Sequence, residues 1–98
     1  MKNLNNQKTY IESWITNTLS TLPSNQHFIG DQYNEDYGFI LLCNAELEID
    51  RDFARAATTL YTEFRQKFGI ETEIIIYPEN DRYAPAKSEL TYIKRCEL

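Results

Sequence analysis

The sequence between Tyr37 and Tyr77 reads as a strand, a helix and a second strand in succession. Residues 37–43 are almost all apolar, residues 50–68 carry apolar side chains at three- and four-residue steps, and residues 71–77 have the composition of a strand. Asp50 stands where a helix N-cap is expected, and Gly69 stands where glycine commonly ends a helix. Because a crossover helix lets the two strands that it joins lie parallel, this unit predicts a sheet with a helix packed on it.

A second helix is predicted near the start of the chain by an apolar stripe at helical spacing. The stripe consists of Ile11, Trp14, Ile15, Leu19 and Leu22. Thr9 and Glu12 have the spacing of a capping box, so we expect this helix to begin at Thr9. Residues 23–25, which include a proline, are expected to end it.

The remaining segments predict two further strands. Residues 26–33 read as a weaker strand, and the polar turn at residues 34–36 predicts an antiparallel hairpin with residues 37–43. Residues 78–85 read as a polar loop, and residues 90–96 as a final strand at an edge of the sheet. The predicted fold is a single α+β domain over residues 1–98, a four-stranded mixed sheet with two helices packed on it in the order α-β-β-α-β-β.

Alternation along residues 70–77 divides the side chains of the third strand between two faces. One face carries Ile74 and Ile76, and the other carries Glu73, Ile75 and Tyr77. The second face changes from charged to apolar along its length. We therefore expect its apolar end to be covered by the first helix.

The formal net charge of −5 argues against nucleic-acid binding, which needs Lys and Arg gathered on one face. The same charge suits a protein partner with a basic surface. The longest apolar stretch, residues 39–43, is too short to cross a membrane, and residues 1–7 lack the apolar segment of a signal peptide. We therefore expect a cytoplasmic protein that has no membrane partner.

The two cysteines, Cys43 and Cys96, fall within predicted strands and lack the spacing of a metal site. A disulfide framework in so short a chain normally uses more cysteines, so we interpret both as buried, reduced side chains. If their strands are neighbours, the two thiols could still pair, and this alternative stays open.

No pattern of catalytic or metal-binding residues stands out in the sequence. The single histidine, His27, would need Cys43 or Cys96 beside it for nucleophilic catalysis, and their spacing does not indicate this. The acids around the predicted hairpin lack the glycine-punctuated pattern of a calcium loop, and no glycine-rich loop precedes either helix. We therefore expect no catalytic residue, no metal site and no cofactor.

Two segments around the hairpin, residues 28–31 and 36–42, loosely resemble the small nucleotidyltransferase families. Those families place a Gly-Ser turn before a strand that carries two carboxylates on alternate residues, which hold magnesium. In this sequence Asp31 stands at the position of the serine, and Gly38 stands at that of the second carboxylate. Because two-metal chemistry needs both acids, the resemblance implies an inactive relative.

Acidic side chains gather between Asp31 and Asp52, a segment that holds seven acids and a single base. One interpretation is a solvated hairpin tip and helix start. The other is a recognition edge, because tyrosine rings give contact area and carboxylates steer a basic partner. The candidate partner-binding residues are Asp31, Tyr33, Glu35, Asp36 and Tyr37 around the hairpin, and Asp81, Arg82 and Tyr83 in the later polar loop.

From these features we predict a non-enzymatic module, such as an inhibitor, an immunity protein or an adaptor, that binds another protein. One alternative is a degenerate nucleotidyltransferase-like domain that binds a nucleotide or metal near Asp31 and Asp36. Another is a homo-oligomeric scaffold, a homodimer for example, in which the terminal edge strand pairs with its own copy.

Overall fold

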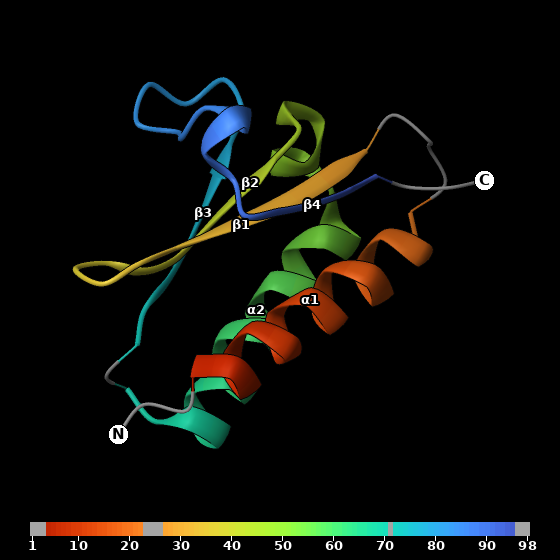
Figure 1. Cartoon of the computed structure of the whole chain (residues 1–98). Coiled ribbons are helices and arrows are strands. Elements are labelled where there is room, and N and C mark those ends of the chain that lie inside the picture. The colour runs from red at the N-terminus through yellow and green to blue at the C-terminus, as the bar shows by residue number, and fades with distance from the viewer. Residues whose placement is uncertain (1–3, 23–26, 71, 96–98) are drawn as a thin grey trace.

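The computed structural model describes residues 4–22, 27–70 and 72–95. Its four strands form one mixed sheet in the order β3-β2-β1-β4, in which β1 runs antiparallel to β2 and β4, and β2 runs parallel to β3 (Figure 1). The elements are α1 (Leu4–Ser20), β1 (Phe28–Asn34), β2 (Gly38–Cys43), the 3₁₀ helix η1 (Ala45–Ile49), α2 (Arg51–Phe68), β3 (Ile74–Pro78), the 3₁₀ helix η2 (Lys87–Glu89) and β4 (Tyr92–Arg95). The predicted α+β class and element order are confirmed.

Both helices pack against the same face of the sheet, which we call the inner face (Figure 1). Burial of each large apolar side chain contributes about 1.5–3 kcal/mol before entropic costs. The Trp14 indole nitrogen donates a hydrogen bond of 2.9 Å to the carbonyl of Ala56, which fixes α1 against α2. The shared core includes Ile11, Ile15 and Leu19 from α1, Ile29, Phe39, Leu41 and Cys43 from the strands, and Phe53, Leu60 and Phe64 from α2.

Helix α2 begins and ends at the predicted residues. Asp50 is the N-cap, and its Oδ1 accepts a hydrogen bond of 2.9 Å from the backbone nitrogen of Phe53. Gly69 is the C-cap, with a φ of +86° and a hydrogen bond from its nitrogen to the carbonyl of Arg65. In the described parts of the chain, neither helix combines the length and the apolar character needed to cross a membrane.

Helix α1 begins earlier than predicted, so the capping box at Thr9 and Glu12 is wrong. The helix starts at Leu4, and Thr9 is an exposed residue within it. The physical reason is that the inward-facing stripe continues toward the N-terminus through Gln7, which is buried, and Leu4, which packs on the core. The helix ends at Ser20, and the residues predicted to end it lie outside the described parts of the chain.

The strands are shorter than predicted at several ends. The hairpin of β1 and β2 is antiparallel as predicted, with Tyr33 opposite Phe39. The third strand begins at Ile74 rather than at residue 71, and β4 lies at the sheet edge as predicted. Cys96 lies outside the described residues, and so does its possible pairing with Cys43.

The other face of the sheet, which we call the outer face, is covered in part by residues 79–91. Ile75 and Tyr77 lie on this face, so the prediction that α1 covers them is wrong. The chain must pass from β3 at one edge to β4 at the other, and the helices already occupy the inner face (Figure 1). On its way the Leu90 side chain packs so closely over Gly30 that a Cβ there would lie 2.6 Å from it.

Candidate protein-binding surface

Residues 79–91 leave part of the outer face open as a groove of about 390 Å³. Its floor is formed by side chains that stand side by side across the sheet, because Gln32 pairs with Ile40 in β2 and Ile40 pairs with Ile75 in β3. Tyrosine rings form much of its wall, so we call it the tyrosine groove. Its lining residues are Gln32, Asn34, Tyr37, Ile40, Ile75, Tyr77, Tyr83, Ala84, Pro85 and Glu89.

The hairpin turn between β1 and β2 places Tyr37 in the lining of the groove. Oδ1 of Asn34 accepts hydrogen bonds from the backbone nitrogens of Asp36, at 2.8 Å, and Tyr37, at 3.2 Å. This arrangement organises the turn internally, as asparagine commonly does in turns. The Tyr37 side chain is nevertheless 60% exposed, so its ring is available to a partner.

Tyr83 lines the groove from the segment after β3. Oδ1 of Asp81 accepts a hydrogen bond of 2.8 Å from the backbone nitrogen of Tyr83, and the Arg82 guanidinium lies 5.1 Å from the centre of the Tyr83 ring. The ring is 71% exposed. The structure therefore brings Tyr37 and Tyr83, two candidates far apart in the sequence, to the same groove.

Two other candidate residues do not reach this surface. Asp31 and Tyr33 lie on the inner side of β1, because alternate residues of a strand face opposite ways. Tyr33 packs edge-to-face on Phe39, with ring centres 5.1 Å apart. Asp31 is only 5% exposed. The candidate acids Glu35 and Asp36 are exposed in the turn next to Tyr37, at the rim of the groove.

Burial dominates the chemistry of Asp31. Burial, helped by the nearby Glu12 and opposed by Lys8, raises the pKa of this carboxyl to about 6. Its Oδ2 has no hydrogen-bond partner among the described residues. Asp31 is therefore a buried acid held between β1 and α1 rather than a contact residue of the outer surface.

Several groove residues were not candidates from the sequence. Alternation correctly placed Ile75 and Tyr77 on one face of β3, which was the available signal. What the sequence pattern did not indicate is that residues 79–91 would turn over this face and bring Glu89 beside them. These residues could not be assigned to the groove from the sequence, because the path of the irregular segment 79–91 over the sheet has no local sequence signal.

The side chains that could act as a nucleophile or a base, Cys43 and His27, are both buried. Burial, together with Glu48 and Glu79, raises the pKa of the Cys43 thiol to about 12, so it stays protonated at neutral pH and is a weak nucleophile. His27 is buried, with its Nε2 3.9 Å from a carboxylate oxygen of Glu46. Within residues 4–22, 27–70 and 72–95, no three His, Cys, Asp or Glu side chains gather where they could hold a metal ion.

Comparison with known proteins finds no match: no family model, curated protein or solved structure is similar to this chain.

Proposed function

We propose that this protein is a non-enzymatic module that binds another protein through the tyrosine groove. The observation that carries the proposal is that two exposed tyrosine rings, Tyr37 and Tyr83, line one groove whose floor holds Ile40 and Ile75 beside Gln32. Tyrosine supplies a large, rigid contact area at low entropic cost, and it is enriched among the residues that dominate binding energy in interfaces. A groove with this lining suits the surface of a protein better than a small charged metabolite.

Charge favours a partner with a basic surface. The chain carries a net charge of −5, Glu35 and Asp36 are exposed beside Tyr37, and Glu89 lines the groove. The Arg82 guanidinium lies over the ring of Tyr83. Carboxylates around an apolar contact area attract Lys and Arg during encounter and orient the partner as it docks.

A cytoplasmic location is part of the proposal. It is supported by Cys43, a buried free thiol. Free thiols suit a reducing compartment, in which disulfides are rare. An intracellular protein with an exposed basic patch is therefore the partner that we expect.

The test is capture of the partner from the native host, followed by binding measurements with the purified partner. Replacing Tyr37→Ser together with Tyr83→Ser should weaken binding at least tenfold, because two rings of hot-spot type are lost. The matched control is Ile49→Ser, which removes an 89% exposed apolar side chain in η1, outside the groove. Circular dichroism checks that all variants remain folded.

The proposal fails if the double variant binds the captured protein as tightly as the wild type does. It also fails if no protein is retained specifically, or if Ile49→Ser and the double variant weaken binding equally.

A further inference from the structure

A second surface lies along β3, which forms one edge of the sheet. The backbone nitrogen of Phe39 donates to the carbonyl of Glu73, and the backbone nitrogen of Glu79 donates to the carbonyl of Cys43, each at 2.8 Å. Residues 73 and 79 therefore turn their backbone groups toward β2. Because successive residues of a strand turn these groups to opposite sides, Ile74 and Ile76 turn theirs toward the free side of β3.

One of these free-side groups already has a partner. Burial raises the pKa of the Tyr61 hydroxyl of α2, Cys43 raises it further, and a hydrogen bond with the backbone of Ile76 opposes this rise. A backbone nitrogen that lowers a phenol pKa acts as donor to its oxygen. No other described residue hydrogen-bonds to the free-side backbone of Ile74 or Ile76. The edge is thus capped at one point by a single side chain.

Two hollows flank Tyr61 along the seam between α2 and β3. One, of about 220 Å³, is lined by Ile74 together with Phe64 and Ile70. The other, of about 230 Å³, is lined by Ile76 together with apolar residues of η1 and α2. Tyr61 lines both hollows. Because side chains two residues apart in a strand point the same way, a strand beside β3 could place alternate side chains in the two hollows.

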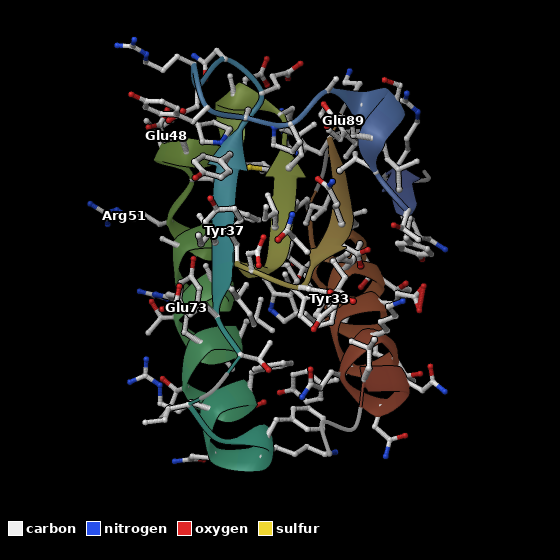
Figure 2. The ribbon with its side chains drawn as sticks, turned by 60° about the vertical axis from the view of Figure 1, so that its left-hand side comes forward. Tyr33, Tyr37, Glu48, Arg51, Glu73 and Glu89 are labelled. Atoms are coloured by element: carbon white, nitrogen blue, oxygen red, sulfur yellow. The ribbon has the colours of Figure 1, made fainter. Side chains whose placement is uncertain are left out.

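The charge along this edge is mostly negative. Figure 2 shows Glu73 near the lower end of β3 and Glu48 near its upper end, whereas Arg51 extends away from the strand. Glu79 follows the end of β3, and both Glu48 and Glu79 raise the pKa of the nearby Cys43 thiol. Two bases oppose these acids: Arg65 lines the same hollow as Glu73, and the Lys87 ammonium lies 3.8 Å from a carboxylate oxygen of Glu79.

We propose that the free edge of β3 accepts an extended segment of a protein partner as an added strand, apolar at alternate positions and carrying Lys or Arg at its ends. Strand addition of this kind draws its affinity from backbone hydrogen bonds and its specificity from pockets for alternate side chains. The unpaired backbone groups, the two hollows and the acidic ends supply these components. A second copy of this chain fits less well, because antiparallel pairing of two β3 strands would bring their acidic ends together.

The test uses a synthetic nine-residue peptide of alternating Val and Thr with Lys at each end, blocked at both termini. Two matched peptides are controls: one carries N-methyl groups on alternate backbone nitrogens, and the other replaces the lysines with glutamates. We expect binding by the first peptide, and at least tenfold weaker binding by each control. Chemical shift changes should centre on residues 74–78.

A sharper readout comes from Tyr61→Phe, which keeps the ring and removes the hydroxyl that occupies the Ile76 nitrogen. Because an added strand would compete with this hydroxyl, the variant should bind the lysine peptide about three- to tenfold more tightly, the equivalent of one net hydrogen bond. Ile74→Pro should weaken binding, because proline removes a free-side donor without touching the bonds to β2. Ile74→Val is its control.

Unchanged or weaker peptide binding by Tyr61→Phe, equal binding of the N-methylated peptide, or no binding of the lysine peptide would each overturn the inference. A wild-type protein that is a dimer in solution, together with an Ile74→Pro variant that is a monomer, would also overturn the inference, because it would show that β3 pairs with a second copy of this chain. The Tyr37→Ser and Tyr83→Ser pair should leave peptide binding unchanged, so this inference and the proposed function can fail separately.

Discussion

The carboxyl group of Asp31 is buried on the side of β1 that faces α1, so its protonation is linked to the stability of the fold. Two charged residues of α1 act on this carboxyl: Glu12 disfavours its ionised form, and Lys8 favours it. Tyr92 of β4 lies opposite Asp31 in the sheet. Burial raises its pKa from 3.8 to about 6. The folded protein therefore binds this proton more tightly than the unfolded chain does.

The consequence is a loss of stability as the pH rises. Below pH 4 both states carry the proton, so Asp31 adds no penalty there. Between pH 4 and 6 the unfolded chain releases the proton first, and above pH 6 the ionised, buried carboxylate costs on the order of 2–3 kcal/mol. Asp31→Asn removes this titration. We therefore expect the difference in unfolding free energy between Asp31→Asn and the wild type to grow in favour of the variant, by on the order of 2–3 kcal/mol, from pH 4 to pH 7.

Urea unfolding of both proteins at several pH values measures the difference. Subtracting one curve from the other cancels the titration of the remaining acids. Parallel stability profiles for the wild type and Asp31→Asn would contradict the raised pKa. Glu35→Gln, at the exposed turn, is a suitable control, since neutralising an exposed acid should change the profile little.

At the scale of elements, α2 could be predicted to the residue because three independent signals agree. Its apolar face, the cap at Asp50 and the stop at Gly69 all coincide. The start of α1 could not, because Gln7 is polar yet buried, and so hides the continuation of the stripe. Local patterns fix an element well only when caps and periodicity point to the same boundaries.

The contact between the start of β2 and the start of β3 depends on Gly38. Its φ is +88°, and a Cβ there would overlap the carbonyl oxygen of Glu73, the acceptor for the backbone nitrogen of Phe39. Gly69 has a similar φ of +86°, but a Cβ there would have no neighbour within 4 Å. A side chain at Gly69 would therefore suffer only backbone strain, whereas a side chain at Gly38 would suffer both backbone strain and steric overlap.

We expect Gly69→Ala to cost about 1–2 kcal/mol of unfolding free energy, the strain of a side chain at positive φ. Gly38→Ala adds displacement of the β3 backbone and should cost on the order of 3–5 kcal/mol. Chemical denaturation of both variants measures these values. If both variants lose the same unfolding free energy, β3 can move away from β2 without cost, and the close contact between Gly38 and Glu73 does not contribute to stability.

At the scale of the whole molecule, the two faces of the sheet could be predicted to different degrees. The inner face follows from the helical stripes. Tyr37 and Tyr83 were candidates on residue type and loop position, but their meeting at one groove depends on the path of residues 79–91. That path is set by contacts such as those of Leu90 over Gly30, which have no local sequence signal.

The charge distribution leads to a final prediction, about the rate of association. If the acids at the hairpin steer a basic partner, Glu35→Lys with Asp36→Lys should lower the association rate constant about tenfold at low salt. The matched control is Glu46→Lys with Asp52→Lys, which makes the same change in net charge at exposed positions in η1 and α2. Neither pair removes a side chain that lines the groove.

Stopped-flow association with the captured partner at 50 mM and 500 mM salt distinguishes local from global charge. Local steering predicts a slower rate for the hairpin pair alone, and a difference from the wild type that shrinks at high salt, where the charges are screened. A similar loss of rate in both pairs would mean that only the total charge matters. A rate for the hairpin pair equal to that of the wild type would place the docking site away from the hairpin, and the free edge of β3 would then be the surface to examine.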